Sequence, residues 1–234
     1  LGYRFNRQWS VDGSVGREWN DVPSTRNDSG GFRWSLNTTW TPNPRTSVRI
    51  GYGDRYFGST PTLDVSYRRR KATLTASYSK VLTDANSQLQ ALAIDPVTGT
   101  VFPVAILNKD VFIDERFTGT LSLKGKRTTV NFSATHSRQN YENKPDRSEL
   151  TKLGVSASRS LSGRVSANAS LNWYQQDQSA TQSAQTWQGR VGMSVKTGPK
   201  SSLSVNYSYN QRDDDTPGES YEENRVSATF SLSL

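Results

Sequence analysis

The stretch RVSANASLNW, residues 164–173, alternates without interruption between polar and apolar side chains. Its odd-numbered residues from Val165 to Trp173 are apolar, and its even-numbered residues from Ser166 to Asn172 are Ser or Asn. Because successive side chains of a β-strand point to opposite faces, this pattern predicts a strand with one apolar and one polar face. The same alternation recurs along the chain and often ends in an aromatic residue.

The composition limits what such strands can build. Only 32% of the 234 residues are hydrophobic, and the mean hydropathy is −0.74, whereas soluble domains carry about 45–50% apolar residues. The chain is therefore too polar to fill a core between two sheets. Its 6 Trp, 10 Tyr and 8 Phe argue against a disordered chain. No apolar run approaches the ~20 residues that a transmembrane helix needs.

These observations predict an all-β fold, a transmembrane antiparallel up-and-down β-barrel whose alternate side chains face lipid and an aqueous lumen. We count thirteen candidate strands and treat residues 1–234 as a single barrel domain. Because bacterial single-chain barrels have an even number of strands, we expect 14 or more in the complete barrel, with at least one strand before Leu1. A β-sandwich is the alternative, but it needs more aliphatic side chains to bury two inner faces.

Short turns and longer polar segments alternate between the candidate strands. The short turns, rich in Gly, Pro, Asn and basic residues, fall near 6–7, 42–45, 69–71, 124–126, 160–163 and 197–200. The longer segments fall near 20–30, 54–61, 83–112, 137–148, 176–185 and 211–220. Outer-membrane barrels have short periplasmic turns and longer extracellular loops. We therefore expect the longer segments outside the cell, with 83–112 as a long extracellular loop.

Aromatic residues recur near the ends of the candidate strands. Trp and Tyr prefer the membrane–water interface, where an apolar ring can carry a polar group into water. The predicted aromatic girdle consists of Trp19, Trp34, Trp40, Tyr52, Tyr67, Tyr78, Trp173, Trp187 and Tyr209.

The polar positions of the strands carry an excess of basic residues. The same alternation predicts that these side chains face the lumen: Arg49, Arg68, Arg116, Lys152, Arg164, Arg190, Lys196 and Arg225. On this interpretation they face fewer acids, Asp64 and Glu223, and the residues between them are mostly Ser, Thr and Asn. A cationic lining would favour the passage of anions. The alternative is that these cations pair with acidic loops or with strands that precede Leu1.

Enzymatic and metal chemistry find little support in the residues. The chain has no Cys and one His, His136, which argues against zinc, haem and iron–sulfur sites. Ser133 or Ser137 could pair with His136, but Ser is frequent throughout the chain, so adjacency carries little weight. The basic run 68–71 lies on a predicted turn and gives no reason to expect nucleic-acid binding. We predict no catalytic residue, no metal site and no cofactor.

Several segments of the chain resemble a known family. WTPNPRTS (40–47), GYGDRYFG (51–58) and YRRR (67–70), with DPVTG (95–99) and YEEN (221–224), are similar to the outer-membrane proteins associated with PEP-CTERM/exosortase systems. The genes of that family accompany exopolysaccharide production, so the resemblance implies a role in export or surface assembly. The matching segments are turns and girdle positions, and no catalytic residue is implied.

Together these observations predict a protein of the bacterial outer membrane. The leading hypothesis is a porin-like channel, or an outer-membrane component linked to exopolysaccharide export or surface assembly. The alternative is a structural barrel with a plugged lumen that anchors loops or a partner protein. The net charge of +8 favours anionic partners. We expect contact with outer-membrane lipid and lipopolysaccharide, and with an anionic polysaccharide or envelope export proteins.

Overall fold

The computed structural model describes residues 1–19, 30–84, 111–142, 147–179 and 182–232. The regular secondary structure in these ranges consists of β-strands. These ranges contain no helix that is long and apolar enough to cross a membrane. The strands are β1 (Gly2–Arg4), β2 (Trp9–Trp19), β3 (Gly30–Asn43), β4 (Thr46–Arg55), β5 (Gly58–Ser59), β6 (Thr62–Arg69), β7 (Ala72–Asp84), β8 (Val111–Lys124), β9 (Thr128–Tyr141), β10 (Arg147–Ser160), β11 (Val165–Ser179), β12 (Gln182–Lys196), β13 (Ser201–Asp214) and β14 (Tyr221–Leu232).

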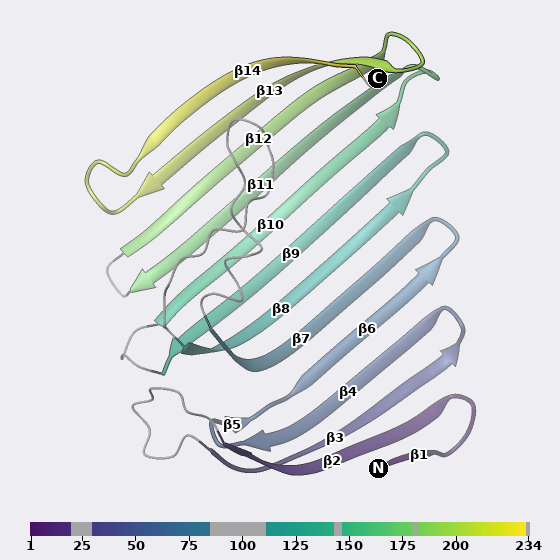
Figure 1. Ribbon diagram of the computed structural model, residues 1–234, viewed down its shortest axis with the longest axis vertical. Helices are drawn as coiled ribbons and strands as arrows, with labels where there is room; N and C mark the ends of the chain where they lie inside the picture. The colour runs from purple at the N-terminus through teal and green to yellow at the C-terminus, as the bar shows by residue number, and fades with distance from the viewer. Residues whose placement is uncertain (20–29, 85–110, 143–146, 180–181, 233–234) are drawn as a thin grey trace.

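The strands form one antiparallel up-and-down sheet (Figure 1). Thirteen of them follow one another in chain order from β1 to β14, while β5 pairs only with β4. The all-β prediction and the number of candidate strands are therefore confirmed. The chain turns back from β4 into β5 between Arg55 and Gly58. Gly58 has a φ of 106°, a left-handed conformation that Gly adopts without a Cβ clash.

The register keeps the alternation of neighbouring strands in phase. Trp173 of β11 lies opposite Trp187 of β12, and Asn172 lies opposite Gln188. Because paired residues of an antiparallel ladder point to the same side, the alternation continues from strand to strand. We call the side that carries Trp173 and Trp187 the apolar face, and the side that carries Asn172 and Gln188 the polar face.

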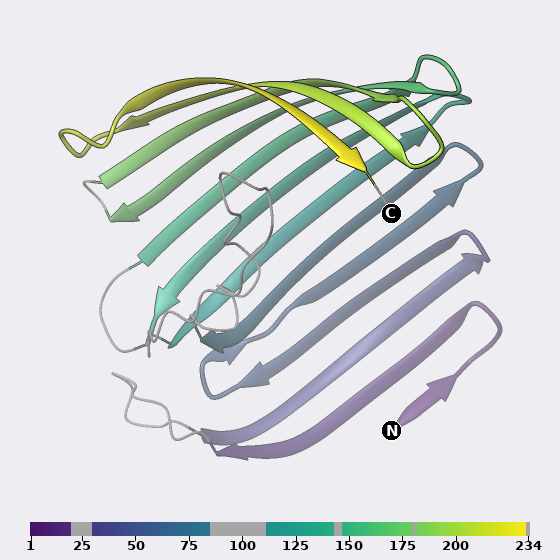
Figure 2. The ribbon, with the colours of Figure 1, turned by 45° about the horizontal axis from the view of Figure 1, so that its top comes forward.

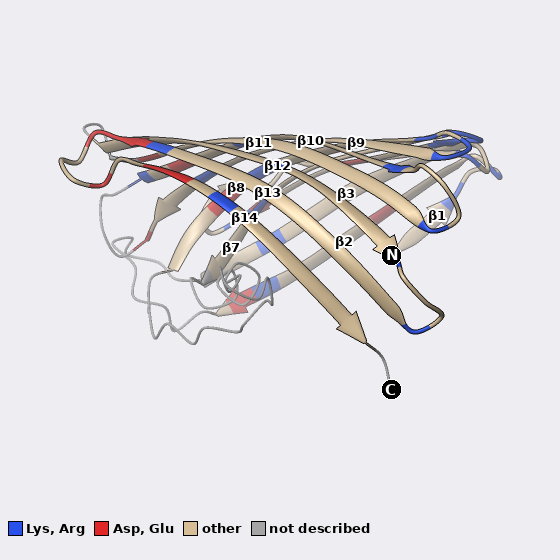
Figure 3. Cartoon of the chain, turned by 90° about the horizontal axis from the view of Figure 1, so that it is seen from above, with Lys and Arg blue, Asp and Glu red and all other residues tan. Residues whose placement is uncertain are grey.

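The sheet curves strongly, so its two faces differ in the space they offer (Figures 2 and 3). On the polar face, a Cβ added at Gly154 would lie 2.7 Å from both Asn172 Oδ1 and Ser133 Oγ. On the apolar face, a Cβ added at Gly119 would meet nothing closer than the Phe117 ring, at 3.6 Å. Side chains converge on the inner side of a curved sheet, and the polar face is therefore the concave one.

The described residues contain no large internal apolar core. Their buried hydrophobic residues are Phe57, Phe112 and Ile113. Large apolar side chains such as Val191 and Phe230 remain 59% and 62% exposed on the convex side. Such an extended apolar surface is unfavourable in water and requires another apolar environment.

The strands extend further than the apolar alternation predicts. β11 ends at Ser179 and β12 begins at Gln182, so the predicted longer loop at 176–185 is wrong. Part of the predicted loop 83–112 also belongs to strands, because β7 ends at Asp84 and β8 begins at Val111. The rest of that loop lies outside the described residues. β1 and β14, the edges of the sheet, do not pair with each other within the described ranges.

Candidate channel-lining face and apolar band

The apolar face forms a band along the strands. In β11 it runs from Val165 to Trp173, nine residues, after which Gln175 and Asp177 occupy the same face. Nine residues at ~3.3 Å each, tilted by about 45°, span roughly 21 Å, close to the ~25 Å apolar band of outer-membrane barrels. The band therefore has the height that a bilayer requires.

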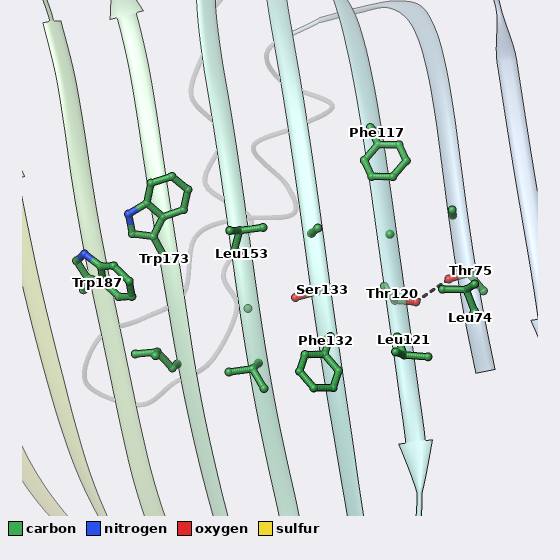
Figure 4. Close-up of a pocket in the computed structure, with 16 residues that line it drawn as sticks. Leu74, Thr75, Phe117, Thr120, Leu121, Phe132, Ser133, Leu153, Trp173 and Trp187 are labelled. Atoms are coloured by element: carbon green, nitrogen blue, oxygen red, sulfur yellow. Dashed lines mark hydrogen bonds between the residues drawn. The ribbon is translucent and has the colours of Figure 1, made fainter. Parts of the chain in front are cut away.

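A shallow groove of about 840 Å³ lies on this band over β7 to β12 (Figure 4). Phe117, Leu153, Trp173 and Trp187 border it with bulky side chains. Small residues lie between these bulky side chains: Gly119 of β8 and its register partner Ala134 of β9. The alternation of bulky and small side chains makes the apolar surface uneven, and flexible lipid chains can pack against such a surface.

All nine residues of the predicted girdle lie on the apolar face, by the strand register. Several of them form ring pairs across neighbouring strands. The ring centroids of Trp34 and Tyr52 lie 6.0 Å apart, and those of Trp173 and Trp187 lie 6.4 Å apart. Trp9, which the girdle prediction omitted, stacks on Trp40 at 5.7 Å.

The band lies asymmetrically along the strands. At the end with the short turns it reaches the last strand residues, since Ala72 follows the β6–β7 turn directly and Val195 is the penultimate residue of β12. At the opposite end, strands β9 to β13 continue beyond the band with mostly polar side chains on both faces. At this end, Lys80 pairs with Glu115 at 3.3 Å, and Arg138 with Glu149 at 2.7 Å.

The predicted lining cations follow the expected alternation. Seven lie on strands and share the polar face, and the eighth, Arg164, lies in the turn before β11. Arg33, Arg55 and Arg212 are among further cations of this face that were not predicted. Their parity within β3, β4 and β13 was a sufficient signal.

Three of the eight predicted cations form ion pairs. Arg49 contacts Asp12 at 2.9 Å, Arg116 contacts Asp114 at 2.9 Å, and Arg225 contacts Glu223 at 2.7 Å. The polar face thus holds more acids than Asp64 and Glu223, and the predicted acid content was too low. The acids missed there are Asp12, Glu18, Asp114 and Asp214.

The other predicted cations form no ion pair with a described residue. Lys152 and Arg190 lie far from the strand ends, and the Lys152 ammonium stands 5.6 Å from the centre of the Tyr174 ring. Arg190 belongs to a row of register partners that crosses the sheet from Arg225 to Arg68. The residues between these three arginines in that row are Ser208, Ser170, Ser156, Asn131, Ser122 and Thr73.

The end of the sheet opposite the short turns is acidic, and several of its acids are held by hydrogen bonds. The pKa of the Asp214 carboxyl lies below its usual range, because the Thr216 backbone N–H and the Arg212 guanidinium donate to it. The pKa of Glu149 is lowered by hydrogen bonds from Arg138 and Arg147. These acids are ionised at neutral pH and neutralise the arginines that they contact.

The structure separates the residues of the candidate catalytic pair. His136 lies on the apolar face, with Nδ1 3.0 Å from Thr151 Oγ1. Ser137 lies on the polar face and donates a hydrogen bond to Asp114 at 2.6 Å. Ser133 has the same parity as Ser137. No proton transfer between His136 and either Ser can take place in this arrangement.

Comparison with known proteins identifies the class of fold. No protein-family model and no curated protein sequence matches the chain. Among solved structures, the in-vitro folded outer-membrane protein OmpT of Vibrio cholerae matches with a TM-score of 0.51 and 12% identity, over 99% of this chain and 85% of that one. Its trimer form matches with a TM-score of 0.52 and 9% identity, over 96% and 99%. The fold is that of a bacterial outer-membrane β-barrel.

Proposed function

We propose that this chain forms a passive pore for small hydrophilic solutes across the bacterial outer membrane, with a preference for anions. The observation that carries the proposal is the concave polar face, lined by Ser, Thr and Asn around Lys152 and Arg190. Hydroxyl and amide groups hold water along a wall, and cations that form no ion pair with a described residue attract anions into it. The convex apolar band supplies the surface that contacts lipid.

Planar-bilayer recording tests this proposal. The folded protein should insert as discrete conductance steps, and the reversal potential in a KCl gradient should show chloride favoured over potassium. Protein whose folding is verified by heat-modifiable gel migration, but which never conducts, would contradict the pore. That result would favour the structural barrel that anchors loops or a partner. A cation-selective pore would overturn the anion preference alone.

We further propose that the solutes include segments of an exopolysaccharide, since the resemblance to the PEP-CTERM/exosortase-associated proteins implies a role in exopolysaccharide export, and that these segments are anionic, as the net charge of +8 favours. The row of hydroxyl and amide groups between Arg225, Arg190 and Arg68 supports this, because such groups hydrogen-bond to sugars and the arginines bind carboxylates. Acidic oligosaccharides should block the single-channel current transiently, and neutral oligosaccharides of the same length should not. Equal blocking by both would contradict the choice of an anionic chain.

A further inference from the structure

The short connections between strands, together with the strand ends that flank them, are uniformly basic. These segments carry fourteen of the 29 Lys and Arg residues and no Asp or Glu. Figure 3 shows these cations gathered at one end of the strands, with acids at the opposite end. We call this set the basic rim: Arg4, Arg7, Arg45, Arg68, Arg69, Arg70, Lys71, Lys124, Lys126, Arg127, Arg159, Arg164, Lys196 and Lys200.

The side chains of the basic rim are exposed, and none forms an ion pair with a described residue. At the opposite end, several cations form ion pairs with acids. Arg55 contacts Glu18 at 2.6 Å, and Arg212 contacts Asp214 at 2.6 Å. Concentrated like charges repel one another, so the rim is stabilised by external anions.

The rim lies at the edge of the apolar band. Lys71 directly precedes Ala72, Leu123 directly precedes Lys124, and Arg164 directly precedes Val165. One strand residue advances the chain by ~3.3 Å, so these cations stand a few ångströms from the last apolar side chains. In a bilayer that distance corresponds to the headgroup region, which basic side chains at the ends of membrane spans reach.

Part of the rim also points outward. Arg69 pairs with Ala72, and Arg159 pairs with Ala167, so both have the parity of the apolar face. A soluble polyanion that enters the lumen would need cations at the mouth alone. The outward cations Arg69 and Arg159, on the β6–β7 and β10–β11 hairpins, lie instead on the perimeter of the barrel, where lipid headgroups lie.

We propose that the basic rim binds the phosphate groups of anionic phospholipids in the leaflet that it borders. This inference rests on the proposed membrane span. Lys and Arg donate charge-assisted hydrogen bonds to phosphate, and basic residues near an anionic surface bind it through a field that salt screens. The rim thereby collects a shell of anionic lipid around the end of the barrel that carries the short turns.

Lipid selectivity measured by electron spin resonance tests the proposal. The protein is reconstituted into phosphatidylcholine vesicles that contain either spin-labelled phosphatidylglycerol or spin-labelled phosphatidylcholine. Phosphatidylglycerol should associate several-fold more strongly with the wild type. The ratio of the two association constants, phosphatidylglycerol over phosphatidylcholine, should fall towards one at about 1 M salt, where the Debye length is only ~3 Å. Heat-modifiable migration and resistance to alkaline extraction verify insertion separately, so a failed membrane span is distinguished from a failed lipid preference.

Two matched variants locate the effect. Replacement of Arg69, Arg70, Lys71, Lys124, Lys126 and Arg127 by Gln removes six of the fourteen rim cations and should lower the preference for phosphatidylglycerol substantially. Replacement of Arg17, Arg33, Lys80, Arg138, Arg147 and Arg212 by Gln removes the same charge from the other end of the strands. This variant should keep most of the preference for phosphatidylglycerol. An inserted wild type without preference, or equal loss in both variants, would overturn the proposal. Rim-dependent binding of a soluble acidic polysaccharide, without lipid preference, would assign the rim to a polyanion instead.

Discussion

Asp12 and Arg49 lie on β2 and β4, yet their side chains meet over β3 with an Oδ2–Nη2 distance of 2.9 Å. Asn37, on β3 between them, donates a hydrogen bond to the same carboxylate at 2.9 Å. Both charged side chains are nearly half exposed, and such pairs contribute only about 0–1 kcal/mol to stability. The main consequence of this pair is electrostatic, because Asp12 neutralises one cation of the polar face.

The pairing predicts opposite effects for two charge-removing variants. Asp12→Asn frees the Arg49 guanidinium and should increase the preference for chloride. Arg190→Gln removes a cation that forms no ion pair with any described residue, and should decrease the preference. Reversal potentials in a KCl gradient measure both changes. Arg138→Gln removes the same charge from the opposite face and serves as the control. A shift in the control as large as that of Arg190→Gln would contradict the assigned lining.

A second prediction concerns the two faces of the sheet. Leu171→Arg places a charge inside the apolar band, where the cost is about 2–4 kcal/mol at the midplane and less towards the interface. Gln188→Arg on the neighbouring strand places the same charge on the polar face and should be tolerated. Trp40→Asp, nearer the end of its strand, should cost less than Leu171→Arg. Urea titrations of folded protein and heat-modifiable migration provide the measurements, and equal effects at Leu171 and Gln188 would refute the assignment of faces.

The positions of the strands could be predicted from the sequence, but their ends could not. Within the apolar band, Val165 to Trp173 alternate because one face requires apolar side chains and the other polar ones. Beyond Trp173 both faces accept polar residues, so the alternation ends while the backbone ladder continues to Ser179. The loop predicted at 176–185 was therefore wrong, although nothing in its composition prevents strand formation.

The lining residues could be predicted only as a set. Parity within a strand identifies the face of Arg49, and the same parity applied to β2 would have identified Asp12 and Glu18. The ion pair itself joins residues 37 positions apart and depends on the register of three strands. Register is a property of the assembled sheet. The distinction between Arg49, which is paired with Asp12, and Arg190, which has no ion-pair partner in the described part of the chain, therefore required the structure.

A third prediction is a pH dependence of stability. Hydrogen bonds from Arg138 and Arg147 lower the pKa of Glu149 in the folded protein. The stability that Glu149 contributes is therefore present above its unfolded pKa of ~4.3 and is lost as the pH falls through the lower folded value. Glu149→Gln should reduce the urea midpoint at about pH 7, and the difference should shrink in strong acid.

Tryptophan fluorescence in detergent micelles follows that unfolding. The control is Glu219→Gln, since Glu219 is exposed and forms no ion pair with a described residue. It should leave the midpoint close to that of the wild type at either pH. A Glu149 effect that stays constant into acid would show that the pair with Arg138 does not stabilise the fold.

The last prediction concerns orientation. The chain has no Cys, so a single introduced cysteine is the only thiol that a maleimide can modify. Glu219→Cys lies in the β13–β14 connection, and Gly163→Cys lies at the other end, where an added Cβ meets nothing within 4 Å. If the short turns are periplasmic, as in other outer-membrane barrels, an impermeant maleimide should label Glu219→Cys on intact cells. Gly163→Cys should react only after the outer membrane is opened. The reverse pattern would place the basic short turns at the cell surface, where the anionic groups that they meet would be those of lipopolysaccharide.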